Sequence, residues 1–118
     1  TDIAVGKEIV AVVDRGNQRV KIFNPRAEFL RALEFTGRGV PYGVAIGPND
    51  GLFVTDTGSK EVCYFDQSGK LLYKFGSEGI SPGKFMFPTK MALGQDRRLY
   101  VADANRSCIL VFAIDYSS

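Results

Sequence analysis

Histidine and tryptophan are absent from this 118-residue sequence, and cysteine occurs only twice. Without histidine, the chain lacks the side chain that most often serves as a general base or as a zinc ligand. It contains no apolar run near the roughly 18 residues that a membrane-spanning helix needs, and no signal-peptide pattern at its start. We therefore expect no membrane association, and catalysis that depends on histidine is excluded for these residues.

The residues that are present form a repeat. Hydrophobic residues make up 45% of the chain and the formal net charge is +2, which is typical of a globular domain with enough apolar surface for a core. One apolar phrase occurs three times, at residues 3–6, 44–47 and 91–94, and each copy is followed by an aspartate and later by a phenylalanine. These positions are Asp14, Asp56 and Asp103, then Phe23, Phe65 and Phe112. From aspartate to aspartate and from phenylalanine to phenylalanine the spacing is 42 and then 47 residues, which is typical of propeller blades.

Each repeat predicts four short antiparallel strands. In the second repeat these are residues 42–47, 52–55, 62–65 and 71–75, separated by turns rich in Gly, Asp, Asn and Ser. Side chains on both faces of these strands are largely apolar, so each sheet must be packed between neighbours. We predict an all-β fold, an arc of a β-propeller with an incomplete ring. It forms one domain with blades at about residues 1–40, 41–87 and 88–118.

Several segments resemble NHL repeats, the propeller repeat at the C-terminus of some tripartite-motif proteins. The matching segments are Pro41–Ala45, Asp14–Phe23, Gly69–Gly76 and the linker Gly76–Phe85. Residues 103–109 lack the glycine of the family pattern, and residues 56–61 replace its Asn and Arg, so the turn chemistry differs between repeats. The resemblance implies an NHL-type propeller, and it says less about function because propellers serve many unrelated functions.

The number of repeats is too small for a closed ring, since propellers have 4 to 8 blades. The third repeat also ends after its third strand. The chain begins with Thr1 instead of Met, which fits a fragment, and we expect the missing strand and blades to precede it. The alternative is a homodimer in which two copies complete a six-bladed ring.

One end of the predicted blades is the candidate binding surface. In a four-stranded meander, the turns between the second and third strands emerge at the same end as the connections between blades. The candidate residues at this end are Arg15, Gln18, Arg38, Tyr42, Lys60, Lys84, Phe85, Lys90 and Arg106. The resemblance implies that RNA or protein partners bind here.

Simpler interpretations of these residues stay open. Acidic residues in the same segments nearly cancel the positive charge, so the Arg and Lys side chains can be ordinary solvated loop residues. Phe85 and Phe87 can stack on bases or anchor a peptide, or they can fill the seam between blades. The repeated aspartates are better explained as acceptors for the amides of their own turns than as metal ligands.

The function predicted from the sequence is that of a non-catalytic recognition scaffold with no cofactor. Its partner is expected to be a protein, and the resemblance implies the substrate-recognition part of a tripartite-motif ubiquitin ligase. The alternatives are an RNA-binding NHL module, with single-stranded RNA as the partner, and a fragment of a propeller enzyme of the amidating-lyase type. Cys63 and Cys108 cannot approach closely enough for a disulfide, and two free thiols favour the reducing cytoplasm.

Overall fold

Three antiparallel sheets make up the computed structural model, which describes residues 2–79 and 82–114. The first sheet contains β1 (Ile3–Val5), β2 (Val10–Asp14), β3 (Arg19–Phe23) and β4 (Phe29–Glu34). The second contains β5 (Pro41–Ile46), β6 (Leu52–Asp56), β7 (Glu61–Phe65) and β8 (Leu71–Phe75). The third contains β9 (Pro88–Leu93), β10 (Arg98–Asp103) and β11 (Cys108–Ala113). The described residues add two short 3-10 helices, η1 (Arg15–Asn17) and η2 (Pro48–Asp50), and no helix among them has the length and apolarity needed to cross a membrane.

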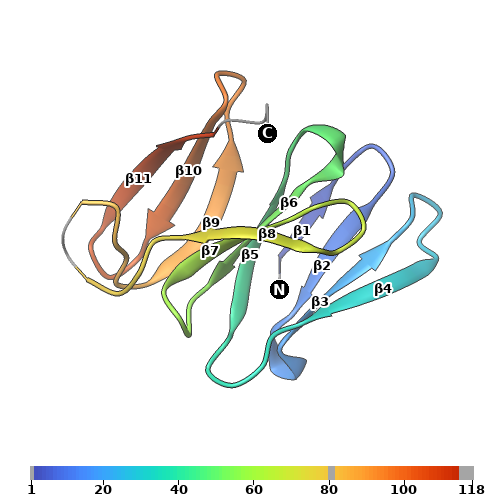
Figure 1. Ribbon diagram of the computed structural model, residues 1–118, viewed down its shortest axis with the longest axis horizontal. Helices are drawn as coiled ribbons and strands as arrows, with labels where there is room; N and C mark the ends of the chain where they lie inside the picture. Colours follow the sequence, from blue (N-terminus) through green and yellow to red (C-terminus); the bar gives the residue numbers. More distant parts are fainter. Residues whose placement is uncertain (1, 80–81, 115–118) are drawn as a thin grey trace.

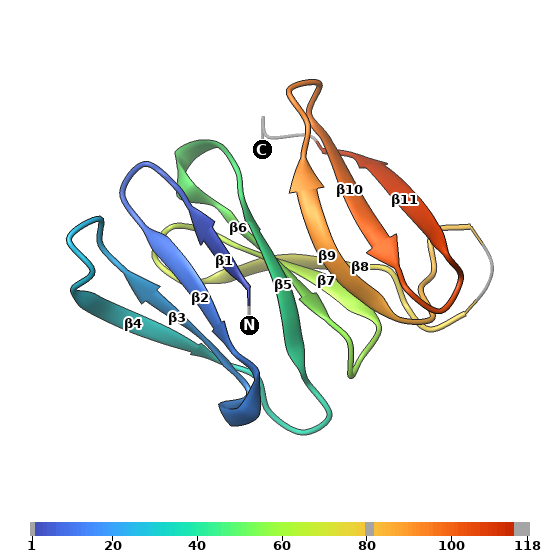
Figure 2. The ribbon, with the colours of Figure 1, turned by 180° about the vertical axis from the view of Figure 1, so that it is seen from behind.

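The sheets are arranged as neighbouring blades. Within each sheet the strands follow one another in chain order. Strand β5 contacts β1 on one side and β9 on the other, so the first strands of the sheets lie side by side and the later strands fan outward (Figure 1; Figure 2). This arrangement confirms the predicted arc of an all-β propeller. The expectation that too little chain follows Phe112 for a fourth strand concerns residues 115–118, which lie outside the described part, as do residues 80–81 of the predicted linker.

Two apolar cores fill the spaces between the sheets. The first core lies between the first and second sheets and includes Val13, Val20 and Leu52, each at most 1% exposed. The second lies between the second and third sheets and includes Phe53, Val62, Phe85, Leu99 and Val101, all fully buried. Strand β7 supplies both cores. Val62 and Tyr64 face the second, while Phe65 packs against the first, as the period of two residues in a strand requires.

The outer faces of the arc carry residues of the type that fills these cores. Ile109 and Val111 of β11 are 65% and 50% exposed. In the repeat they correspond to Val62 and Tyr64, which the third sheet covers. At the other end Ile3 and Val5 of β1 are 61% and 73% exposed, although the equivalent residues of β5 pack against the first core. Both outer faces therefore expose apolar side chains of the kind that a neighbouring sheet covers elsewhere in the arc. Whether preceding blades or a second copy supplies it stays a prediction.

Carboxylate and hydroxyl groups join neighbouring sheets at fixed points. The carboxylate of Asp50, which is 4% exposed, accepts the backbone N–H groups of Lys7 and Glu8 at 2.8 and 2.6 Å, joining the second sheet to the first. Between the second and third sheets, the buried hydroxyl of Thr55 accepts the N–H of Gly43 at 2.7 Å and donates to the carbonyl oxygen of Thr89. These hydrogen bonds fix the position of each sheet relative to the next.

Gly43 permits the close approach of β5 and β9. A Cβ atom at this position would lie 2.4 Å from the carbonyl oxygen of Thr89 and 3.0 Å from the Cα atom of Lys90. Because the obstructing atoms belong to the backbone, a side chain here would force the two inner strands apart. Because Gly43 has no side chain, β9 lies close enough for the Thr55 hydroxyl to reach the carbonyl oxygen of Thr89.

Replacing Thr55 with valine tests the bond between the sheets. Thr55→Val keeps the side-chain shape but leaves the buried N–H of Gly43 and the carbonyl of Thr89 without this partner, so we expect a loss of about 1–3 kcal/mol in the free energy of unfolding. Urea denaturation measures the change. The matched control is Thr36→Val in an exposed loop, which should differ from the parent by less than about 0.5 kcal/mol. Equal losses in both variants would contradict the assignment.

The two cysteines lie in different environments, and both are free, as predicted. Cys63 is buried between the sheets, whereas Cys108 is only partly buried on β11. Burial, with the negative charge of Asp56 as a smaller contribution, raises the pKa of the Cys63 thiol to about 12. Since the thiolate is the reactive form, Cys63 should be chemically inert in the folded protein.

Alkylation with iodoacetamide at pH 8 distinguishes the two thiols. We expect Cys108 to be modified in the native protein and Cys63 only after denaturation, because its thiol is both inaccessible and protonated. Mass spectrometry of digested protein gives the rate at each site, and a Cys108→Ser variant should take up no label until it is unfolded. Labelling of native Cys63 at the rate of a free thiol would show that the second sheet is not packed as described.

Candidate partner-binding site

The turns and connections at one end of the sheets form a continuous surface, which we call the loop face. It consists of the turns after β2, β6 and β10 and of the connections from β4 to β5 and from β8 to β9, and it lies along the lower side of Figure 1. All the residues predicted to contact a partner lie in these segments or beside them. The conserved spacing of the repeat places one aspartate, at the end of the second strand of each sheet, at this face.

Asp56 fixes the middle of the loop face. Its Oδ1 atom accepts the N–H groups of Gly58 and Ser59 at 3.0 and 3.1 Å, which stabilises the turn after β6. The same oxygen accepts the N–H of Val40 at 2.8 Å, so the connection that enters β5 is tied to this turn. The predicted role of this aspartate as an acceptor for its own turn is confirmed, and it extends to a second segment.

Asp103 has a different role from the predicted one. Its carboxylate is 1% exposed and accepts the N–H groups of Met86 and Phe87 at 2.8 and 3.0 Å. Neither amide belongs to the turn after β10, so the prediction of a lock within its own turn is wrong for Asp103. The cause is the long connection between β8 and β9, which passes beside the end of β10 and presents two amides to the carboxylate.

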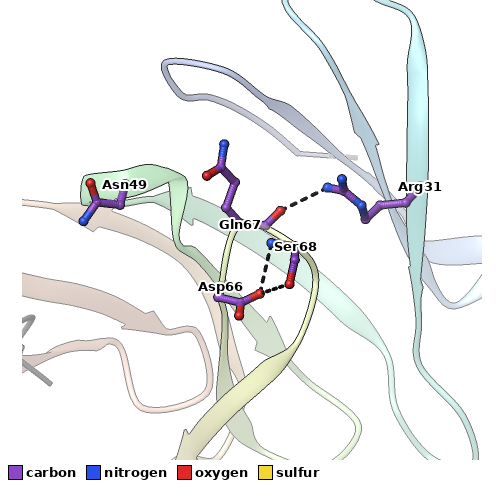
Figure 3. Close-up of a pocket in the computed structure, with 5 residues that line it drawn as sticks. All are labelled: Arg31, Asn49, Asp66, Gln67 and Ser68. Atoms are coloured by element: carbon purple, nitrogen blue, oxygen red, sulfur yellow. Dashed lines mark hydrogen bonds between the residues drawn. The ribbon is translucent and has the colours of Figure 1, made fainter.

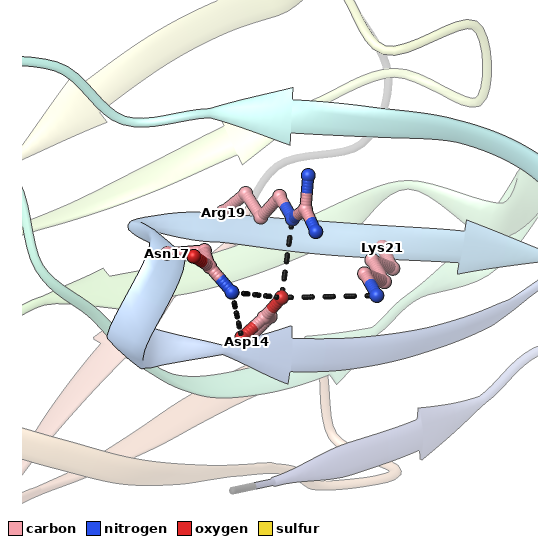
Figure 4. A network of polar contacts seen from close by, with 4 residues as sticks. All are labelled: Asp14, Asn17, Arg19 and Lys21. Atoms are coloured by element: carbon pink, nitrogen blue, oxygen red, sulfur yellow. Dashed lines mark hydrogen bonds and ion pairs between the residues drawn. The ribbon is translucent and has the colours of Figure 1, made fainter.

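Asp14 also departs from the prediction, because it binds side chains instead of turn amides. Its carboxylate accepts the amide Nδ2 of Asn17 at 3.0 Å and Nε of Arg19 at 3.1 Å, and it lies 3.8 Å from the ammonium of Lys21 (Figure 4). The hydrogen bond from Asn17 and then that from Arg19 hold the pKa of Asp14 below its ordinary 3.8. Because the folded pKa is lowered, this network favours the folded state at neutral pH, and that contribution is lost as the pH falls through the folded pKa.

Two cations and two aromatic rings form a row across the loop face. The guanidinium carbon of Arg15, in η1, lies 4.9 Å from the ring centroid of Tyr42. The Tyr42 and Phe87 rings meet edge to face with centroids 6.2 Å apart, and the Lys60 ammonium lies 5.2 Å from the Phe87 centroid. Cations over ring faces and edge-to-face rings are both favourable arrangements. This cation–aromatic row joins the turns after β2 and β6, the start of β5 and the connection that enters β9.

A small pocket opens beside the row. Asp2, Val13, Arg15, Tyr42 and Lys90 line a cavity of about 120 Å³ where the first strands of the sheets meet. The Asp2 carboxylate accepts the N–H of Val44 at 3.1 Å and lies 3.9 Å from the Lys90 ammonium. The pocket therefore combines one anchored carboxylate with two cations and the side of an aromatic ring.

The structure brings together four of the nine predicted residues, namely Arg15, Tyr42, Lys60 and Lys90. Two others brace the loops. Gln18 donates from Nε2 to the carbonyl oxygens of Gly39 and Gly37 at 2.6 and 3.2 Å, and Arg106 donates to the carbonyl oxygen of Lys84 at 3.1 Å. Arg38 and Lys84 are exposed on the connecting loops.

Phe85 does not lie at the surface. Its side chain is fully buried in the second core, 5.7 Å from the ring of Phe112, so the prediction that it contacts a partner is wrong and its interpretation as a seam residue is confirmed. Phe87 takes the surface position instead. The sequence allows Phe87 either a contact or a seam position, and it predicts no role for Asp2. No local pattern marks Asp2, because its partners come from β5 and β9.

A larger and more open hollow lies at the opposite end of the sheets. Arg31, Asn49, Asp66, Gln67 and Ser68 line a space of about 560 Å³ between strand β4 of the first sheet and two turns of the second sheet (Figure 3). Ser68 donates its hydroxyl and N–H to Asp66, and the hydroxyl bond is the main reason that the Asp66 pKa lies below its ordinary value. Arg31 donates to the Gln67 carbonyl oxygen at 3.0 Å. This hollow is polar, shallow and formed by turn contacts, and it lacks the aromatic side chains of the loop face.

Among the described residues, metal-ligating side chains do not gather at either end of the sheets. Within residues 2–79 and 82–114, no group of three or more Cys, Asp or Glu side chains is placed to hold a metal ion. The repeated aspartates lie in separate sheets and accept hydrogen bonds from protein groups.

Comparison with known proteins agrees with this architecture. Residues 47–118 match the 6-bladed beta-propeller family. The chain belongs to this family. No curated protein matches this chain.

Solved structures share the fold of this six-bladed propeller family member. A streptogramin B lyase has a TM-score of 0.71 at 15% identity, covering 98% of this chain and 40% of the lyase. A catalytically inactive histidine-to-alanine variant of virginiamycin B lyase from Staphylococcus aureus, with quinupristin, has a TM-score of 0.70 at 16% identity, covering 98% of this chain and 41% of that one. A protein of unknown function from Bacteroides thetaiotaomicron has a TM-score of 0.69 at 20% identity, covering 86% and 30%. The chain spans about two fifths of the lyases' length, and identities this low show the fold alone.

A test of the loop face begins with Asp103. The Asp103→Asn side chain keeps one oxygen that can accept one of the two N–H groups. The other N–H group then faces the side-chain NH2, which is a donor and cannot accept a hydrogen bond. We expect a loss of about 1–3 kcal/mol in the free energy of unfolding, together with faster hydrogen exchange at the amides of Met86 and Phe87. Urea denaturation and exchange measured by NMR report these effects.

The control for this substitution is Asp96→Asn. Asp96 accepts an N–H at 3.2 Å from Arg98 in an exposed turn at the opposite end. Its replacement should change the unfolding free energy by less than about 0.5 kcal/mol. Unchanged exchange at Met86 and Phe87 in Asp103→Asn would mean that another group holds this loop.

Proposed function

We propose that this propeller segment is a non-catalytic recognition scaffold that binds a protein partner through the loop face. The observation that carries the proposal is the cation–aromatic row of Arg15, Tyr42, Phe87 and Lys60. Arginine and aromatic side chains are enriched among the residues that dominate binding energy at protein interfaces. On the loop face such side chains lie in a row beside a pocket lined by Arg15 and Tyr42.

The loop face is also held in place before any partner arrives. Side-chain hydrogen bonds to backbone groups hold the connections between sheets against the ends of the strands. They are made by Asp56, Asp103 and Gln18. A surface that is already ordered loses little conformational entropy on binding, which raises affinity without additional contacts. The rigid ends of the sheets thus support recognition by loops, a common arrangement in binding proteins.

The finer assignment rests on the sequence resemblance to NHL repeats. It supports an NHL-type propeller that selects substrates for a tripartite-motif ubiquitin ligase in the cytoplasm. The motifs behind it, such as Pro41–Ala45 and Gly69–Gly76, form part of β5 and the turn and strand of β8. The ligase chemistry would lie outside these residues, because they contain two cysteines and no histidine.

The lyase relatives favour an enzyme as the second candidate. One of them is described as catalytically inactive after replacement of a histidine by alanine. These 118 residues contain no histidine, so they cannot supply an equivalent group. We propose a binding role for this segment, and the amidating-lyase alternative would require catalytic residues from another part of a longer protein.

Affinity capture tests the proposed role. The immobilised chain should retain a reproducible set of proteins from a cytoplasmic extract, also after the extract is treated with ribonuclease. We expect Arg15→Glu and Lys60→Glu to reduce capture several-fold, because both change the row, while Arg26→Glu and Lys70→Glu at the opposite end leave it unchanged. Quantitative mass spectrometry measures the captured proteins, and thermal unfolding confirms that each variant is folded. Loss of capture after ribonuclease treatment would contradict a protein-binding loop face. Capture that is unchanged in the Arg15→Glu and Lys60→Glu variants would contradict it as well.

A further inference from the structure

The charged groups of the loop face differ in what they contact. The carboxylates of Asp56 and Asp103 accept backbone N–H groups, and that of Asp14 binds the side chains of Asn17 and Arg19. Several cations near these carboxylates form no ion pair with a carboxylate in the described part of the chain. This holds for Arg15, Arg38, Lys60, Lys84 and Arg106. An incoming anion could therefore reach these cations without displacing an internal ion pair.

Arg15 and Lys60 are the best placed of these cations. Arg15 lies over the Tyr42 ring, and Lys60 lies over the Phe87 ring while its ammonium donates to the Thr57 carbonyl oxygen at 2.9 Å. Each long side chain is thus positioned by a ring beneath it, which reduces the entropy that an ion pair normally loses when it forms on a mobile side chain. The two cations act as fixed points at the ends of the row.

The arrangement of the rings favours a carboxylate over a nucleobase. Single-stranded RNA binds such surfaces mainly by stacking its bases on open aromatic faces. Here a cation lies over each ring, and the two rings also contact each other edge to face. A base would have to displace one of these groups to stack, whereas a carboxylate can pair with the cations where they are.

The length of the row indicates more than one acidic residue. Three successive contacts of 4.9, 6.2 and 5.2 Å lead from the Arg15 guanidinium to the Lys60 ammonium. An extended peptide advances about 3.3–3.6 Å per residue, so roughly five residues at most cover this span. From these observations we infer that the loop face recognises an extended acidic segment of its partner, with carboxylates a few residues apart pairing with Arg15 and Lys60. This inference rests on the proposed function and names the chemistry of the partner.

Fluorescence anisotropy with three labelled probes tests the inference. The probes are a deca-glutamate peptide, a deca-lysine peptide and a decauridylate RNA, each titrated with the full chain at low and at physiological salt. We expect the glutamate peptide to bind more tightly than the other two and its affinity to fall as salt is added, since the contacts are exposed ion pairs. Tighter binding of the RNA would overturn the inference in favour of a nucleic-acid surface.

Matched variants locate the binding site. Arg15→Ala and Lys60→Ala should each weaken binding of the glutamate peptide by about two- to five-fold, as expected for removal of one exposed ion pair. Arg26→Ala and Lys70→Ala remove the same charges from exposed turns at the opposite end and should leave the affinity unchanged. Equal weakening in all four variants would show that net charge, and not the row, attracts the peptide, and would overturn the inference.

The outcome is separable from that of the proposed function. If the extract proteins are captured through Arg15 and Lys60 while the glutamate peptide does not bind, the loop face is a protein-binding surface and only the acidic-segment inference fails. If capture fails as well, the proposed function fails with it.

Discussion

Buried carboxylates that accept backbone N–H groups from a neighbouring segment hold the ends of the sheets together. Asp50 binds two amides of the first sheet's inner turn, Asp56 binds the connection entering the second sheet, and Asp103 binds the connection entering the third. Each carboxylate meets more than one N–H, so its charge is stabilised although the side chain is buried. The apolar cores favour packing of the sheets, and these bonds fix their relative position.

The geometry of the loop face follows from this arrangement. The carboxylate of Asp103 accepts the backbone N–H of Phe87 and so fixes this residue at the edge of the third sheet. The Phe87 ring then contacts Tyr42 of the second sheet and lies beneath the ammonium of Lys60, which belongs to the turn between β6 and β7. Four side chains far apart in the sequence are then aligned by one buried carboxylate and the close approach of β5 and β9. The loop face depends in this way on the same contacts that fix the position of one sheet against the next.

The repeat made most of the fold predictable from the sequence. Alternating apolar positions on strands such as β7 require neighbours on both faces, and the turn residues mark where each strand ends. The roles of the aspartates were less accessible, because the amides that Asp103 accepts come from a segment 16 to 17 residues away and not from its own turn. Phe85 and Phe87 look alike in the sequence, yet the path of the connection points one into the core and the other to the surface. These placements depend on how neighbouring sheets pack against each other, and a local sequence pattern carries no information about that packing.

The position of Phe85 has a consequence for the connection between β8 and β9. The residue belongs to a loop but occupies the second core, and a Cβ atom on Gly76 would lie 2.3 Å from its ring. Moving the part of this connection around Phe85 away from the sheets would therefore extract a phenylalanine from between the second and third sheets. Any force on this segment would act directly on the packing between the second and third sheets, so the connection and the second core are mechanically coupled through Phe85.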